Sequence, residues 1–164
     1  MNGAALLERA PVRRVREALA AAGATGAVQV LAETARTAGD AARALGCETG
    51  AIVKSLVFRA GEEAVMALLA GDRRCDAAKL QKALGIAMPP GRADADFVQL
   101  WTGYSIGGVA PLGHLRPIPV AIDASLARFP RIFAAAGHPH CVFPTDFAEL
   151  QRLTGGISAD LAQV

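Results

Sequence analysis

The spacing of apolar positions changes along the chain, and each spacing predicts a different kind of element. Val12, Val15 and Leu19 recur at helical intervals with arginines between them, so a helix is expected from Pro11 to the glycines at 23 and 26. Capping residues before the apolar positions and glycines after them predict further helices at 37–45, 76–84, 94–102 and 145–154.

Runs of β-branched and apolar residues predict the strands. The clearest pair is 51–58 and 64–69, which a turn at 60–63 joins into a hairpin. Shorter strands are expected at 28–31, 118–122, 131–135 and 141–143, and two prolines near 118 suggest that this strand begins at a sheet edge. Since strands and helices are mixed without regular alternation, the pattern predicts an α+β fold with a mixed, largely antiparallel sheet rather than a doubly wound one.

The composition supports a single globular domain over residues 1–164. Apolar residues make up 52% of the chain and charged residues 20%, which is enough for a core and leaves little room for disorder. No apolar run reaches the ~20 residues that span a bilayer, and the first residues lack a signal pattern, so a cytoplasmic protein without membrane contact is expected. The cysteines at 47, 75 and 141 are widely spaced and form no zinc-binding pattern, which is typical of reduced thiols.

Residues 103–114 (GYSIGGVAPLGH) contain four glycines and one proline, which excludes a regular helix or a central strand. Tyr104 and Ile106 are not typical of a flexible linker, so the segment is expected to be an ordered loop whose backbone approaches a ligand. Gly107 and Gly108 can direct N–H groups at a developing oxyanion, although a tight turn would also explain the pair.

Lys54 lies within the most apolar strand of the chain. A lysine in this position either points to solvent or reaches into a pocket, where its ammonium group would hold a carbonyl or a phosphate. His114 is either a hydrogen-bonded loop residue or a general base, and the sequence assigns it no partner. His138 and His140 lack a third ligand, so no metal site is expected. No Walker, Rossmann or nucleophile-elbow motif is present, and no cofactor is expected.

A net charge of +2 excludes a strongly basic nucleic-acid binder but allows local basic patches. Four arginines lie between positions 9 and 16, and a second cluster contains Arg73, Arg74, Lys79 and Lys82. Each cluster is either a solvated helix face or a surface that contacts phosphates.

Two segments together resemble the YbaK/prolyl-tRNA synthetase-associated domain family: IVKSLVF at 52–58 and GYSIGGVAPLGH at 103–114. Their separation also resembles the family pattern, as do the flanking segments, so the resemblance covers roughly residues 12–158. It implies a mixed six- or seven-stranded sheet with surrounding helices. It also implies an aminoacyl-tRNA deacylase that acts in trans, as a proofreading enzyme for translation, most often on misacylated tRNA-Pro.

The resemblance also implies a set of functional residues. It carries the family's lysine onto Lys54 and the glycine-loop backbone onto Gly107 and Gly108, with the amino-acid pocket between them. The expected lining residues of the pocket are Ser55, Leu56, Phe58, Met66, Ile106, Pro111 and His114. The expected tRNA-binding residues are Arg73, Arg74 and Lys79.

Several alternatives stay open at this point. Lys54 either stabilises the oxyanion or holds the terminal adenosine phosphate of the tRNA. The removed amino acid is expected to be small, although the run from Gly107 to Pro111 differs from that of the cysteine-specific branch of the family. The expected partners are aminoacyl-tRNA and prolyl-tRNA synthetase, with no DNA. The alternative function is a non-catalytic module of the same fold that binds tRNA or a synthetase.

Overall fold

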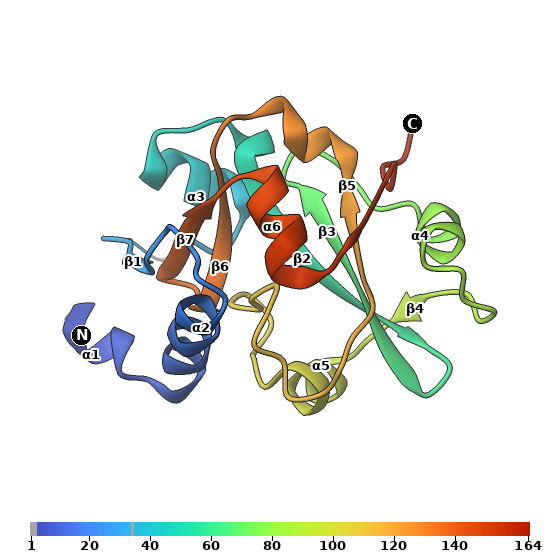
Figure 1. Cartoon of the computed structure of the whole chain (residues 1–164), viewed down its shortest axis with the longest axis horizontal. Helices are drawn as coiled ribbons and strands as arrows, with labels where there is room; N and C mark the ends of the chain where they lie inside the picture. The colour runs from blue at the N-terminus through green and yellow to red at the C-terminus, as the bar shows by residue number, and fades with distance from the viewer. Residues whose placement is uncertain (1–2, 34) are drawn as a thin grey trace.

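The structure is a computed structural model, and it describes residues 3–33 and 35–164. Within these residues the strands form one eight-stranded mixed sheet of order β1-β7-β6-β2-β3-β5-β8, with β4 also paired to β2 (Figure 1). The strands are β1 (Gln29–Val30), β2 (Ile52–Ala60), β3 (Glu63–Ala70), β4 (Gly91–Arg92), β5 (Val120–Asp123), β6 (Ile132–His138), β7 (Cys141–Thr145) and β8 (Ile157–Ala159). The predicted α+β class is confirmed, and the two-residue strands β1 and β4 bring the sheet above the expected six or seven strands.

Five of the six α-helices in the described residues begin and end close to the predicted positions, and the first one was not predicted. They are α1 (Gly3–Leu7), α2 (Ala10–Ala21), α3 (Ala38–Leu45), α4 (Ala77–Leu84), α5 (Ala95–Thr102) and α6 (Phe147–Thr154), with 3₁₀ helices η1 (Thr49–Ala51) and η2 (Ala124–Arg128). The side chains of Thr37, Asp76 and Asp94 each accept a hydrogen bond from the first turn of the helix that follows. Gly46 and Gly85 end two of these helices in the left-handed conformation that glycine adopts without strain.

The central hairpin differs from the predicted one in its turn. Strands β2 and β3 pair antiparallel from Val53–Ala70 to Ala60–Glu63, so only Gly61 and Glu62 lie between them. The predicted four-residue turn at 60–63 is therefore wrong. Gly61 has φ +64°, which lets the chain reverse tightly and extends both strands.

The two faces of the sheet are covered by different helices. Val53, Met66 and Leu68 belong to a core cluster with residues of α2, α5 and α6. Leu69 packs with Leu80 of α4 on the opposite face, and Ile52 packs with α3 on that same face. Figure 1 shows α6 crossing in front of the sheet and α4 standing at its β5 end.

Strand β2 has one fully paired edge and one interrupted edge. Along β3 the pairing is continuous, whereas β6 pairs only with Ile52 and Val53, and β4 only with Phe58 and Arg59. Between these points residues 54–57 have no strand partner on that edge within the described chain. The sheet is therefore open in the middle of β2.

The predicted edge position of the strand near residue 118 needs correction. Strand β5 lies between β3 and β8, so it is not an edge strand, and the prolines that precede it lie outside the paired residues. Parallel pairing of β5 on both sides buries all four of its residues.

Candidate functional site

A cavity of about 860 Å³ lies at the interrupted edge of β2. Its lining comes from β2, the segment around the start of α3, β4, the glycine loop and the β6–β7 hairpin. Of the residues expected to line the pocket, Ser55, Leu56, Phe58 and Ile106 do so, together with Lys54 and Gly107. Apolar neighbours such as Val98, Val109 and Phe133 complete the wall. The cavity thus has a largely apolar interior with one ammonium group from the central strand.

Lys54 reaches the cavity from the face of β2 that carries α3 and α4. Its neighbours on that face are Ile52, which packs with α3, and Leu56, which packs near α4. The Nζ atom donates a hydrogen bond to the carbonyl oxygen of Arg73 in the β3–α4 loop. Burial lowers the pKa of Lys54 from its ordinary value, and the nearby carboxylate of Asp72 partly opposes this.

Ser55 points to the other face of the strand and brings a polar atom into the wall. Its Oγ is buried and has no hydrogen-bond partner among the described residues. Residues in antiparallel strands direct their backbone groups alternately toward and away from the partner strand. Because Ile52 accepts a hydrogen bond from Gly71 on the β3 side, the backbone groups of Ser55 and Val57 point toward the opening. The wall therefore offers unpaired backbone donors and acceptors as well as a hydroxyl.

The two glycines of the loop have different positions. Gly107 lines the cavity with φ +101°, and its N–H has no acceptor among the described residues. The N–H of Gly108 donates to the carbonyl of Ser105 at 3.0 Å, and its own carbonyl accepts from Gly137 at 2.9 Å. Gly108 therefore closes a turn and ties the loop to β6, while Gly107 is the glycine that faces the cavity.

Tyr104 anchors the loop from inside the core. Its hydroxyl donates to the carbonyl of Leu112 at 2.8 Å, with the carbonyl of Gly113 at 3.1 Å. The side chain is fully buried, and this burial raises the pKa of Tyr104 to about 12. The loop is thus an ordered element, as its mixture of glycines and apolar residues predicts.

Three of the expected lining residues lie away from the cavity wall. Met66 is fully buried in the core, because its position on β3 directs it to the α2 side. Pro111 is a buried residue of the glycine loop and does not line the cavity. The Nε2 atom of His114 lies 2.8 Å from the carbonyl oxygen of Ala110, and burial lowers the pKa of this histidine. These three residues therefore lie outside the cavity wall and pack behind it.

His138 lines the cavity. The sequence analysis considered this residue only together with His140, as a possible pair of metal ligands. It is the last residue of β6, and its Nδ1 accepts a hydrogen bond from the N–H of His140 at 3.0 Å. Burial lowers its pKa, as do the nearby charges of Arg9 and His140. A polar residue at the end of an otherwise apolar strand is the only sequence signal for this position.

The basic residues near the cavity and in the β3–α4 region have three different environments. Arg36 and Arg92 are exposed and line the cavity, which the sequence did not predict. Arg73 and Arg74 are exposed in the β3–α4 loop. Lys79 instead donates to Asp160 at 2.9 Å and to the carbonyl of Ala162 at 2.6 Å, so its charge is partly used within the fold. The tRNA-binding role of all these residues stays a prediction.

The described residues also bear on membrane contact and metal binding. Their helices are all too short or too polar to cross a bilayer. No three histidine, cysteine or acidic side chains among them converge on a common point where a metal would bind.

The chain is similar in sequence to a known domain family and to several known proteins. A sequence profile of the aminoacyl-tRNA editing domain matches residues 32–153. The uncharacterized protein YwhH of Bacillus subtilis (strain 168) is 34% identical over 102 residues, which cover 62% of this chain and 64% of that protein. A proline–tRNA ligase of Thermoanaerobacter sp. (strain X514) is 28% identical over 109 residues, which cover 66% of this chain but only 19% of the ligase.

The fold is also similar to that of a solved structure. A protein proposed as a trans-editing enzyme for prolyl-tRNA synthetase superposes with a TM-score of 0.88 and is 39% identical. The match covers 95% of this chain and 99% of that one. The two chains therefore share the fold over nearly their whole length.

Proposed function

Because the chain belongs to the aminoacyl-tRNA editing domain family, we propose that it hydrolyses misacylated tRNA in trans. The ester bond between a wrong amino acid and the terminal ribose is broken by water. The amino acid leaves with a carboxylate, and the ribose oxygen of the tRNA regains its proton. In this role the protein is a proofreading enzyme of translation, and it works where charged tRNA is found, in the cytoplasm.

The observation that carries this proposal is the position of Lys54 at the interrupted edge of β2. The ammonium group uses one N–H on the Arg73 carbonyl and has two further donors for a polar ligand in the cavity. The ester carbonyl develops negative charge when water adds to it, and a fixed cation or backbone N–H nearby stabilises that charge. Lys54 and Gly107 both line the cavity, and they supply one group of each kind.

A side-chain nucleophile is not required by this chemistry. Water attacks the ester directly when the carbonyl is held and polarised in a fixed position. His138 is the imidazole at the cavity wall, and its lowered pKa keeps it neutral near pH 7. A neutral imidazole can accept a proton from the attacking water or orient it by a hydrogen bond.

The cavity also supports the proposed class of amino acid. Val98, Val109 and Ala135 line its interior, and such a wall accepts a small apolar side chain. The unpaired Ser55 hydroxyl gives one position where a polar side chain or the α-amino group would bind. We propose a small amino acid on tRNA-Pro as the substrate, with prolyl-tRNA synthetase as the enzyme whose errors are corrected.

We propose that the tRNA approaches the cavity at Arg36 and Arg92. They are the exposed cations of the cavity lining, from the segment before α3 and from β4. The 3′ end of a tRNA must pass such an entrance for its aminoacyl group to reach Lys54. Arginine binds phosphate through paired N–H groups, so these two residues are proposed contacts to the last backbone phosphates.

The test is a deacylation assay on tRNA-Pro charged with alanine, cysteine, serine, threonine or 2-aminobutyrate. The wild-type protein is compared with Lys54→Ala and with Lys82→Ala, a control that removes an exposed lysine of α4. We expect hydrolysis of at least one substrate, a loss of about 10²-fold or more in kcat/KM for Lys54→Ala, and no change for Lys82→Ala. Absence of hydrolysis with tRNA binding retained would instead support the non-catalytic module.

A second variant separates the two roles of Lys54. Lys54→Arg keeps the positive charge but changes its position and geometry. If Lys54 stabilises the oxyanion, this variant loses kcat, whereas a lysine that only holds a terminal phosphate would mainly change KM. Full activity of Lys54→Ala would contradict the site assignment even if the protein is a deacylase.

A further inference from the structure

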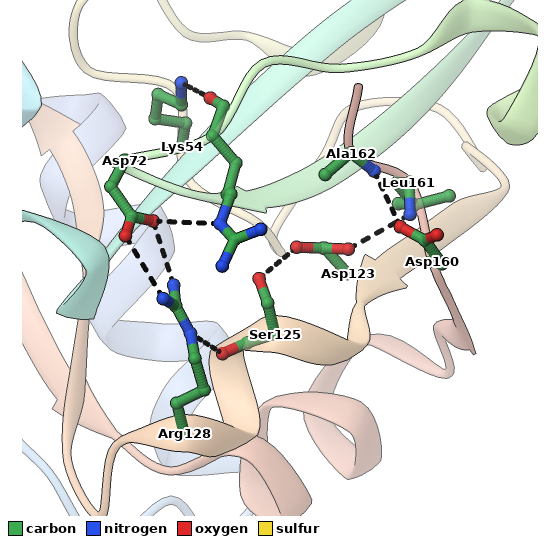
Figure 2. A network of polar contacts seen from close by, with 9 residues as sticks. Lys54, Asp72, Asp123, Ser125, Arg128, Asp160, Leu161 and Ala162 are labelled. Atoms are coloured by element: carbon green, nitrogen blue, oxygen red, sulfur yellow. Dashed lines mark hydrogen bonds and ion pairs between the residues drawn. The ribbon is translucent and has the colours of Figure 1, made fainter. Parts of the chain in front are cut away.

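A polar network outside the cavity wall connects η2 to the loop that holds Lys54. The guanidinium of Arg128 donates two hydrogen bonds to the carboxylate of Asp72, at 2.9 and 3.2 Å, one to each oxygen. The same guanidinium donates through Nε to the carbonyl of Ser125 at 2.7 Å. Figure 2 shows Arg128 directed at Asp72, with Lys54 close to the same loop.

The position of Arg128 is restricted on its other sides as well. Its guanidinium carbon lies 5.0 Å from the ring centre of Phe129. A Cβ atom at Gly50 would lie 2.9 Å from that ring and 3.0 Å from the guanidinium, so a side chain there would displace one of them. An arginine that is stacked and hydrogen-bonded in this way has few alternative rotamers, and it defines where Asp72 lies.

The loop that contains Asp72 also contains the acceptor of Lys54. Arg73 follows Asp72 directly, and its carbonyl oxygen accepts the hydrogen bond from Lys54 Nζ. The far end of the loop is fixed by the C-terminal segment, through Asp76 N–H to Leu161 and Gln163 N–H to Arg74, both 2.8 Å. The loop is thus held at two ends, and Arg128 supplies the end nearer to Lys54.

The choice of partner for Lys54 is chemically unexpected. An ammonium group prefers a carboxylate to a neutral carbonyl, and Asp72 is near enough to influence the pKa of Lys54. Lys54 nevertheless bonds to the Arg73 carbonyl, while Asp72 receives two hydrogen bonds from Arg128 and a longer ion pair from Arg73 Nε at 3.7 Å. A lysine bound to a carbonyl keeps its full charge available for a substrate, whereas a lysine paired with a carboxylate does not.

We propose that Arg128 is a positioning residue that acts through Asp72: it keeps the carboxylate away from Lys54 and holds the Arg73 carbonyl against Nζ. This inference rests on the proposed function, since it concerns how Lys54 is kept ready for the ester carbonyl or a phosphate. Arg128 does not line the cavity, and its pair with Asp72 is partly exposed. Such a pair contributes little to overall stability, so a positioning role explains its geometry better than a structural one.

The test uses four forms of the full chain: wild type, Arg128→Ala, Asp72→Asn and the double variant Asp72→Asn/Arg128→Ala. In Arg128→Ala the Asp72 carboxylate keeps only its longer ion pair with Arg73, so it is free to turn toward Lys54, and we expect kcat/KM for deacylation to fall about tenfold. In the double variant no carboxylate is left to pair, so activity returns to within about threefold of wild type. Arg131→Ala, which removes an exposed arginine three positions later, is the matched control and is expected to have no effect.

A second readout does not depend on activity. The chain has only three lysines, at 54, 79 and 82, so ¹³Cε-labelled lysine gives three NMR signals that single Lys→Arg variants assign. We expect the pKa of Lys54 to rise in Arg128→Ala and to fall back in the double variant. Arg74 and Cys75, the other groups that influence Lys54, are unchanged in all four forms.

The two readouts separate the inference from the proposed function. If no form deacylates any tRNA but the pKa of Lys54 follows this pattern, the proposed function fails and the positioning role stands. If the double variant is as inactive as Arg128→Ala, or the pKa of Lys54 is the same in all four forms, the positioning role is wrong. Equal loss of thermal stability in Arg128→Ala and the double variant, with activity lost in both, would assign the pair a structural role.

Discussion

The carbonyl oxygen of Gly108 accepts a hydrogen bond from the N–H of Gly137 at 2.9 Å, and this contact joins the glycine loop to the end of β6. Through it, the cavity wall that contains Gly107 is placed against the wall that contains His138. The approach is close: a Cβ atom at position 108 would lie 2.8 Å from the backbone nitrogen of His138. The second glycine of the pair is therefore required by packing between two backbones.

We predict that Gly108→Ala separates the loop from β6. The backbone atoms that a methyl group would meet cannot rotate away, so the loop itself must move. The expected loss in unfolding free energy is about 1–3 kcal/mol. We expect the deacylation rate to fall by a larger fraction of its wild-type value than the unfolding free energy does. Urea denaturation and the deacylation assay measure the two effects.

Gly39→Ala is the matched control for stability. Position 39 lies in the first turn of α3, and a Cβ there makes only an ordinary contact at 3.8 Å with Thr37. Replacing a helical glycine by alanine is expected to stabilise the protein by about 0.5–1 kcal/mol. An unchanged midpoint for Gly108→Ala would show that the loop accommodates a side chain, and the proposed contact between the two walls would lose its importance.

The elements that local signals define were predicted correctly from the sequence. Thr37 accepts a hydrogen bond from Asp40 N–H at 3.0 Å, as the capping pattern predicts, and Gly46 ends the helix. Such signals involve residues three or four positions apart, so one sequence contains all of the information. The prediction of the hairpin turn was less accurate. The residues 60–63 are compatible both with a four-residue loop and with a tight turn at Gly61, and the sequence alone does not distinguish the two.

The site was predicted only in part, because it is built from contacts between distant segments. The opening in β2 arises because β6 and β4 pair with its two ends and leave the middle free. Nothing near Lys54 in the sequence indicates this. His138 and Arg92 line the cavity from positions far from both signature segments, and Met66 turned away from it because strand register decides the face. The glycine pair could be found from the composition of the segment. That Gly107 lines the cavity while Gly108 packs against β6 could not be predicted, because this depends on where Gly137 lies.

The partly buried His114 predicts a pH dependence of stability. Its ordinary pKa is about 6.5, and burial lowers the pKa in the folded protein. Below about pH 6.5 the unfolded chain therefore binds a proton that the folded protein resists, so acid favours unfolding. The stabilisation is complete above that pH and decreases as the pH falls toward the folded pKa. His138 acts in the same direction, since its pKa is also lowered.

His114→Gln isolates this contribution. Glutamine keeps an N–H donor for the Ala110 carbonyl and does not titrate, so the loss of stability between pH 7 and pH 5 should be smaller than in wild type. Urea midpoints at pH 7, 6 and 5 measure the difference, with Lys82→Gln as a surface control that keeps the wild-type slope. Parallel curves for wild type and His114→Gln would mean that His114 does not resist protonation in the folded state.

The cations that line the cavity predict the salt dependence of tRNA binding. Each phosphate that an arginine neutralises releases counterions, so losing one contact reduces the slope of log K against log salt by about 1. We expect this reduction for Arg36→Gln and for Arg92→Gln with uncharged tRNA-Pro, because both side chains are exposed beside the proposed path of the 3′ end. Lys79→Gln should change the slope much less, since Asp160 and the Ala162 carbonyl already bind its ammonium. Fluorescence anisotropy between 50 and 200 mM salt, roughly the range over which such contacts differ most, measures all three slopes. An unchanged slope for both arginine variants, with a reduced slope for Arg74→Gln, would move the tRNA from the β4 side of the opening to the β3–α4 loop.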